Sequence, residues 1–239
     1  MRVTSLTLLI LAIQMTVFAS DIKSFTINTD AFLKKYVVNG QVAYARLKQN
    51  VAEAENLYHE INMMNLTKSD EAEKKAFYIN AYNIVVIYAV VKHFPIKSPM
   101  DKAGFFDTIK HIVAGESLTL NELERKKLLQ PYRDGRFHFV LVCAARSCPS
   151  LANFAYTPEK IEDQLTERTA LTLNDKEWLK VYPKQKKADI SKIFEWYSDD
   201  FKSGGKTVLD WINQFRIEKI PSSYAVGFYE YDWSLNILK

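Results

Sequence analysis

The stretch Ser69–Lys92, SDEAEKKAFYINAYNIVVIYAVVK, decides the fold. Thr67, followed three residues later by Asp70, resembles a capping box, and apolar residues then recur at helical spacing. The apolar run Ile84–Val91 has the length of a buried helix segment and is too short to span a bilayer. Since the stretch ends just before Phe94-Pro95, it predicts one long helix that stops there.

Shorter elements are predicted on both sides of this helix. Before it, helical patterns over Thr29–Tyr36 and Tyr44–Met64 flank the turn signal Asn39-Gly40. After it come predicted helices over Phe105–Lys110, Asn121–Leu129, Thr157–Leu173, Ser191–Phe201 and Lys206–Phe215, hairpins at Ala114-Gly115-Glu116 and Lys180–Lys187, and strands over Arg136–Cys143 and Val226–Trp233. The pattern indicates an α+β fold, a mostly helical framework with a small antiparallel sheet.

Composition bounds the class of protein. The chain has 239 residues, of which 48% are hydrophobic and 25% charged, as in globular proteins. A net charge of +4 is too small to indicate nucleic-acid binding. The histidines are scattered, and we find no H-E-x-x-H, no C-x-x-C and no glycine-rich phosphate loop, so we expect neither a metal site nor a cofactor.

The first residues predict an exported protein. Residues 1–19 have a basic start, an apolar stretch from Leu6 to Phe18 and small residues before Ser20. This pattern is typical of a secretory signal peptide that is cleaved after Ala19. Residues 20–239 then form a single domain that is periplasmic or secreted, soluble, and without a stable membrane anchor.

Asn80 and Asn83 are polar residues inside the apolar helix. They lie three positions apart and so share one helix face. A buried carboxamide without hydrogen bonds costs about 1–3 kcal/mol. These side chains therefore either tie the helix to neighbouring backbone or line a pocket and bind a ligand.

The segment Arg136–Ser150 carries the candidate catalytic groups. His138 lies in the predicted buried strand. Both cysteines of the chain, Cys143 and Cys148, follow within the same segment. Because Pro149 favours the first position of a helix, Cys148 would be its N-cap, where the helix dipole favours the thiolate. With His138 as base and Glu124 to orient it, Cys148 would be the nucleophile of a thiol-dependent hydrolase or acyl transferase.

A disulfide is the alternative for the same cysteines. An exported protein with two closely spaced cysteines favours a Cys143–Cys148 bond. Closing so short a loop would stabilise the fold by about 2 kcal/mol. The bond would also consume the nucleophile. The deciding question is whether the turn brings the two Cα atoms to about 5.5 Å.

Several short stretches resemble the family called domain of unknown function 547. They occur in the order seen in that family: Asn39–Tyr44, Phe77–Asn83, Leu118–Glu124, Arg136–Pro149, Ile193–Phe201 and Tyr231–Asn236. The resemblance runs from about Ala31 to Leu238. Its most specific parts are the asparagine-bearing helix and the His-Phe segment that leads to the Cys-Pro turn.

The resemblance implies an exported, bacterial-type member of that family. A helix followed by a small sheet bearing histidine is also distantly similar to papain-like and transglutaminase-like topology, with the nucleophile position near Asn80, which is no nucleophile. The chain departs from the family at Glu124-Arg125, where many members have Glu-His. Any role of that histidine is therefore absent here.

Two functions follow from these residues. The first is a binding or structural domain with a buried cluster of Asn80, Asn83, Glu124 and His138 and a Cys143–Cys148 disulfide, whose partner is a small ligand or a peptide. The second is the thiol-dependent enzyme, acting on peptide or cell-wall amides through Cys148 and His138. Thiol labelling before and after reduction distinguishes them.

Overall fold

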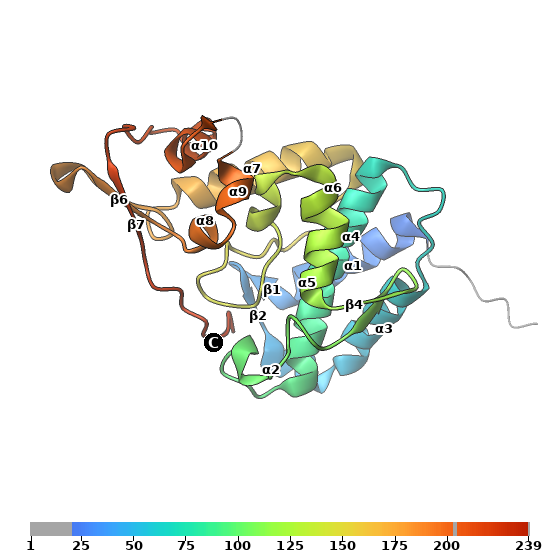
Figure 1. Cartoon of the computed structure of the whole chain (residues 1–239). Coiled ribbons are helices and arrows are strands. Elements are labelled where there is room, and N and C mark those ends of the chain that lie inside the picture. The colour runs from blue at the N-terminus through green and yellow to red at the C-terminus, as the bar shows by residue number, and fades with distance from the viewer. Residues whose placement is uncertain (1–20, 203–204, 239) are drawn as a thin grey trace, which may run out of the picture.

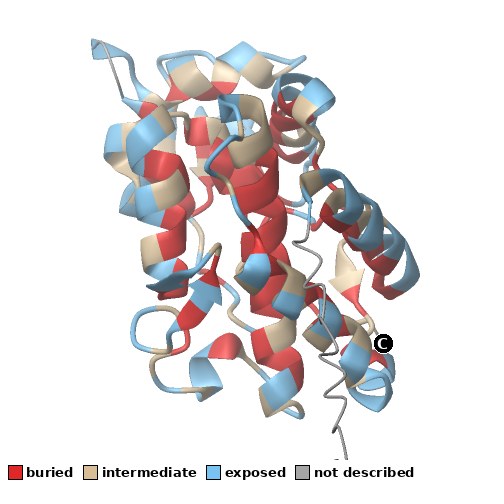
Figure 2. Ribbon diagram, turned by 90° about the vertical axis from the view of Figure 1, so that its right-hand side faces the viewer, coloured by how far each residue is buried: buried red, intermediate tan, exposed pale blue. Residues whose placement is uncertain are grey.

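The centre of the computed structural model, which describes residues 21–202 and 205–238, is the helix α4 (Glu71–His93) (Figure 1). Asp70 caps it by accepting a hydrogen bond from the Glu73 N–H, and the Glu73 carboxylate accepts one from the Asp70 N–H. From Ala76 to Val91, every residue but Tyr88 is buried (Figure 2). A helix that is apolar on all sides is stable only when other elements surround it, and the predicted long helix is confirmed.

The N-terminal elements pack along one side of α4. They are α1 (Ile22–Tyr36), β1 (Val37–Val38), β2 (Gln41–Val42), α2 (Tyr44–Gln49) and α3 (Val51–Met63). Asn39 and Gly40 have φ angles of 49° and 77°, and positive values at both central residues identify the hairpin turn that joins β1 to β2. The helix predicted over Tyr44–Met64 is divided at Asn50.

On another side of α4 lie a hairpin and a helix with a change of winding. The 3₁₀ turn η1 (Pro99–Asp101) comes first. The helix predicted over Phe105–Lys110 is absent, because these residues form turns and irregular chain. The hairpin turn predicted at Ala114-Gly115 is confirmed. The elements that follow are β3 (His111–Val113), β4 (Glu116–Leu118), α5 (Leu120–Glu124), the π-helical turn η2 (Arg125–Leu129) and α6 (Gln130–Tyr132).

The C-terminal third adds the remaining helices and a small sheet. It contains η4 (Pro158–Lys160), α7 (Ile161–Asn174), β5 (Lys180–Tyr182), η5 (Pro183–Gln185), β6 (Lys187–Ile190), α8 (Ile193–Trp196), α9 (Ser198–Phe201), α10 (Val208–Phe215) and β7 (Ala225–Phe228). The β5–β6 hairpin is antiparallel, as predicted, whereas β7 pairs with β6 in parallel. The α+β fold class is confirmed.

The strand predicted over Arg136–Cys143 is wrong. Gly135–Phe139 forms the 3₁₀ helix η3, and irregular chain follows up to Cys148. The physical reason is that a side chain takes the place of a neighbouring strand. The Asn83 amide accepts a hydrogen bond from the Val142 N–H at 3.0 Å and donates one to the Val140 carbonyl at 2.9 Å. A buried backbone group needs a partner, and here one side chain of α4 supplies two.

The last residues, Tyr231–Leu238, form a segment that joins distant parts of the chain, and we call it the C-terminal segment. The Leu238 N–H donates to the Val42 carbonyl, the Leu235 N–H to the Lys97 carbonyl, and the Arg146 N–H to the Ser234 carbonyl. The strand predicted over Val226–Trp233 instead ends at Phe228, and the chain beyond it contacts β2 and two separate loops.

The signal peptide predicted over residues 1–19 lies outside the described residues. Among residues 21–202 and 205–238, no helix combines the length and apolar character that crossing a membrane requires.

Candidate ligand-binding cavity

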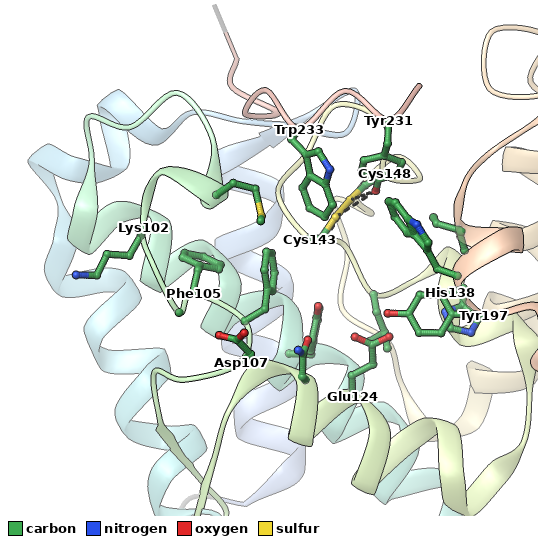
Figure 3. A pocket seen from close by; sticks show the side chains of 18 of the residues that line it. Lys102, Phe105, Asp107, Glu124, His138, Cys143, Cys148, Tyr197, Tyr231 and Trp233 are labelled. Carbon is green, nitrogen blue, oxygen red and sulfur yellow. Dashed lines mark hydrogen bonds between the residues drawn. A yellow bond between two sulfur atoms is a disulfide. The ribbon is translucent and has the colours of Figure 1, made fainter. Parts of the chain in front are cut away.

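A cavity of about 400 Å³ opens beside the Cys143–Cys148 bend (Figure 3). Its walls come from segments far apart in the sequence: the loop after η1, the helices α5 and α8, and the C-terminal segment. Aromatic side chains dominate the lining, namely Tyr82, Phe105, Phe106, Trp196, Tyr197, Tyr231 and Trp233. The polar side chains that line it are Lys102, Asp107, Asn121, Glu124 and His138. Mostly apolar walls with a few polar groups are the usual form of a small-molecule site.

Three aromatic rings at the rim of the cavity pack against one another. Trp196 and Trp233 are stacked, with ring centroids 5.9 Å apart and an angle of 24° between the rings. The ring centroid of Tyr231 lies 5.0 Å from that of Trp196 and 4.8 Å from that of Trp233. Trp196 nevertheless remains 47% exposed and Met100 57% exposed. This rim therefore presents apolar surface that the fold itself leaves uncovered.

Glu124 is a buried carboxyl group at the end of α5, where the helix changes to the π-helical turn η2. In Figure 3 the Tyr197 side chain points toward its carboxylate. Burial raises the pKa of Glu124 above its ordinary value, and His138 and the Tyr197 hydroxyl act in the opposite direction. The cation that acts on it, Arg125, does so more weakly than these groups. Desolvation is thus the largest influence on this carboxyl.

His138 is held by an acidic partner that the sequence did not indicate. Its Nε2 lies 2.8 Å from the Asp200 carboxylate, at the end of α9. The imidazole ring also packs against Tyr197 and Phe201, with centroid distances of 4.2 and 5.2 Å. The hydrogen-bond partner of His138 is therefore Asp200, while Glu124 lines the same cavity without bonding the ring.

The Cys143–Cys148 disulfide is present, with Cα atoms 6.4 Å apart. The Cys148 Sγ accepts a hydrogen bond from the Cys143 N–H at 3.1 Å and another from the Tyr231 hydroxyl at 3.1 Å. Both cysteines line the cavity. The bond uses the thiol that the enzyme hypothesis requires as its nucleophile.

The helix predicted to begin at Pro149 is absent, since irregular chain continues from Cys148 to Thr157. The bend at Cys148 is instead held from outside. The Ser147 N–H donates to the Asp232 carbonyl at 3.2 Å, and the Trp178 Nε1–H donates to the Ser147 carbonyl at 3.2 Å. Cys148 is therefore no helix N-cap, and no helix dipole acts on its sulfur.

Asn80 and Asn83 bind backbone and do not line the cavity. Asn80 donates to the Tyr156 carbonyl at 2.8 Å and accepts from the Tyr156 N–H at 2.9 Å. Asn83 does the same for Val140 and Val142. The predicted cluster is thus divided: Glu124 and His138 face the cavity, and the asparagines hold the loops behind it.

The aromatic walls and Asp200 are the site residues that sequence reasoning missed. The signal available for the walls was the density of aromatic residues in short stretches such as Trp196-Tyr197 and Tyr231–Trp233. Asp200 lies 62 positions from His138 in the sequence, so no local pattern could have predicted this pair. No cluster of three His, Cys, Asp or Glu side chains suited to a metal ion occurs in the part of the chain that the structure describes.

Comparisons with known proteins give one match, to a family model. No curated protein and no solved structure matches this chain. A family model described as "Protein of unknown function, DUF547" matches residues 66–171. The matched segment includes α4 with its asparagines, Glu124, His138 and the disulfide. The match covers residues 66–171, less than half of the chain, and supports the assignment of this segment to the DUF547 family.

Proposed function

We propose that this protein is exported after removal of residues 1–19 and acts as a binding domain. Its ligand is a small organic molecule with a flat apolar face and a positively charged nitrogen. The observation that carries the proposal is a buried carboxyl, Glu124, in an aromatic-walled cavity of about 400 Å³.

The walls select for a flat, apolar face. Trp196 and Trp233 stack with an angle of 24° between their rings, and Phe105 and Phe106 also line the cavity. Indole and phenyl rings bury large apolar areas and stack on other planar groups. The uncovered surface of Trp196 would be buried by such a ligand.

The charge of the ligand follows from Glu124. Burial disfavours the carboxylate form, and His138, the Tyr197 hydroxyl and, more weakly, Arg125 offset this only in part, since the pKa of Glu124 remains raised. A ligand ammonium group would stabilise the carboxylate directly, and the surrounding rings would attract the same cation through their π faces. One positively charged group thus satisfies two features of the site.

Export fits the disulfide. Disulfides form and persist in oxidising compartments such as the periplasm, and the segment 1–19 has the pattern of a signal peptide. Mass spectrometry of the protein recovered from the periplasm would test this part. We expect an N-terminus at Ser20, and a chain that retains Met1 would contradict it.

The binding proposal is tested with a pair of probes of similar shape, benzylammonium and benzyl alcohol. Because Trp196 and Trp233 line the cavity, ligand binding should change tryptophan fluorescence. We expect benzylammonium to bind about tenfold more tightly than the alcohol. In Glu124→Gln the preference should disappear, and in Trp233→Leu both probes should bind weakly.

Glu167→Gln is the matched control, since Glu167 is an exposed carboxyl on α7. It should retain the wild-type preference for the cation. Equal affinities for both probes in the wild-type protein, or a preference that survives in Glu124→Gln, would contradict the proposal.

A thiol-dependent hydrolase or acyl transferase is the second candidate. The observation that favours it is that Cys148, His138 and Glu124 line one cavity. Its nucleophile exists only in reduced protein, because the disulfide occupies both sulfurs. Labelling thiols near neutral pH is the test: a single hyper-reactive thiol would support the enzyme, and cysteines that become labelled only after reduction would exclude its simple form.

A further inference from the structure

The disulfide lies where a small molecule can reach it. Both sulfur-bearing residues line the cavity, Cys143 is half-buried and Cys148 is 7% exposed. A disulfide that only stabilises a fold needs no opening beside it. Its stabilising effect, about 2 kcal/mol, is at the low end for a disulfide, because the bond closes a loop with a sequence separation of only 5.

The two sulfurs have different surroundings. The Cys148 Sγ accepts hydrogen bonds from the Cys143 N–H and from the Tyr231 hydroxyl, each at 3.1 Å. The same hydroxyl lies 3.3 Å from the Cys143 Sγ, so the donor that distinguishes the two sulfurs is the Cys143 N–H. Donors of this kind stabilise a thiolate more than a neutral sulfur, because hydrogen bonds to charged acceptors are stronger. In thiol–disulfide exchange, the sulfur that is better stabilised as a thiolate is the better leaving group. The surroundings therefore favour attack on Cys143 and departure of Cys148.

We propose that the Cys143–Cys148 disulfide is a redox-active centre that oxidises an apolar small-molecule thiol bound in the cavity. The proposal rests on the proposed function only in that the thiol enters the same cavity. The aromatic walls set the substrate class, a thiol carried on a flat apolar group. Tyr231 is a positioning residue that acts through the Cys148 sulfur.

The exchange balances in two steps. A substrate thiolate attacks the Cys143 Sγ, a bond forms between these sulfurs, the Cys143–Cys148 bond breaks, and its electron pair remains on Cys148 as a thiolate. A second substrate thiolate then attacks the substrate sulfur of this mixed disulfide and releases Cys143. Two thiols are oxidised to one disulfide, the protein disulfide is reduced, and the two thiol protons end on the cysteines.

The test compares folded oxidised protein with the same protein unfolded in urea. Each is mixed with benzyl mercaptan or with 2-mercaptoethanol, and the remaining disulfide is followed by acid quenching and mass spectrometry. A sealed structural disulfide reacts more slowly when folded. We expect the reverse for benzyl mercaptan, with folded protein reacting at least about tenfold faster than unfolded protein, and a smaller ratio for 2-mercaptoethanol. Slower reaction of the folded protein with both thiols would overturn the proposal.

A variant tests the role of the hydroxyl. Tyr231→Phe should slow the reaction of folded protein about tenfold, by removing one donor to Cys148, and should leave the unfolded rate unchanged. Tyr229→Phe is the matched control, because Tyr229 lies in the same part of the chain but does not line the cavity. An equal rate in Tyr231→Phe and wild type would overturn the positioning role of Tyr231. Peptide mapping that places the benzyl mixed disulfide on Cys148 would overturn the leaving-group assignment.

The benzylammonium titration on the same preparation separates this proposal from the proposed function. Binding of the cation together with a protected disulfide would overturn the redox proposal alone. Rapid reduction by benzyl mercaptan without binding of the cation would overturn the charge preference and support the redox proposal.

Discussion

Glu124 shows how one residue acquires its properties from its place. The same helix carries Glu122, whose pKa is lowered to about 2 by hydrogen bonding with Lys110, the Thr119 N–H and Lys126, whereas burial raises the pKa of Glu124. These carboxyls are two positions apart, and their pKa values are shifted in opposite directions. The difference between the two pKa values comes from solvent exposure and hydrogen-bond partners. Neither can be read from the residue type, which is the same at both positions.

Glu124 should make the protein less stable as the pH rises. Because its folded-state pKa is raised by burial, the folded protein holds this proton more tightly than the unfolded chain, and stability falls as the pH passes from the unfolded value near 4.3 through the raised value. Glu124→Gln cannot ionise. We expect the Tm of this variant, relative to wild type, to increase from about pH 4 to about pH 8. A Tm difference that is constant with pH, as expected for the control Glu167→Gln, would contradict the assignment.

His111 should have the opposite effect. Burial lowers its pKa from 6.5 to about 4, and its Nε2 has no hydrogen-bond partner among the described residues. The neutral ring is stable in the fold, so stability is lost as the pH falls from about 6.5 toward about 4. Urea unfolding should show a loss of about 1–3 kcal/mol over this range.

The comparison that isolates this effect is His111→Gln, which should lose less stability in acid than the wild type. His59→Gln is the control, because His59 is exposed on α3. If both variants lose stability in acid as the wild type does, another group causes the acid sensitivity.

At the scale of elements, α4 organises the cavity without lining most of it. Its buried asparagines hold two loops, one at Tyr156 and one at Val140–Val142. The second loop leads directly to Cys143. A buried helix can carry a polar side chain only where that side chain is hydrogen-bonded, because an unpaired buried amide destabilises the fold.

Asn80→Ala and Asn83→Ala should each destabilise the protein by about 2–4 kcal/mol in urea unfolding, because each leaves a buried backbone N–H and a buried carbonyl without their partner. Asn28→Ala removes a hydrogen bond between exposed side chains of α1 and α3 and should stay within about 0.5 kcal/mol of wild type. Unchanged unfolding of both buried variants would show that the loops are held by other contacts.

At the scale of the whole molecule, the C-terminal segment joins the first hairpin to the cavity. The Tyr44 hydroxyl, which is buried, donates to the Asn236 Oδ1 at 3.0 Å across most of the chain length. The Asn236 N–H donates to the Ala144 carbonyl in the disulfide bend. The segment that supplies Tyr231 and Trp233 to the cavity is thereby anchored at the opposite end of the sequence.

Removing either partner of this bond should destabilise the fold. We expect Tyr44→Phe and Asn236→Ala each to cost about 1–3 kcal/mol, since each leaves a buried polar group unpaired. The double variant should cost about 1 kcal/mol less than the sum of the single variants. Tyr182→Phe, at an exposed tyrosine, is the control. Strict additivity would show that the two side chains do not interact.

The local structure could be predicted where a few neighbouring residues decide it. The long helix, the Asn39-Gly40 turn, the Ala114-Gly115 turn and the β5–β6 hairpin were predicted from spacing and turn chemistry. The disulfide followed from two nearby cysteines. The Arg136–Cys143 strand was wrong because its residue types suit a strand, but its hydrogen-bond partner is an α4 side chain.

The sequence by itself determined the central helix, its two buried amides and the proximity of the cysteines, because periodicity, capping and short loops act over a few residues. Only the tertiary structure decided that Asp200 meets His138 and that Phe105, Trp196 and Trp233 line one cavity with Glu124. These groups come from segments distant in the chain. Their meeting depends on how every intervening element packs, a property that no single stretch carries.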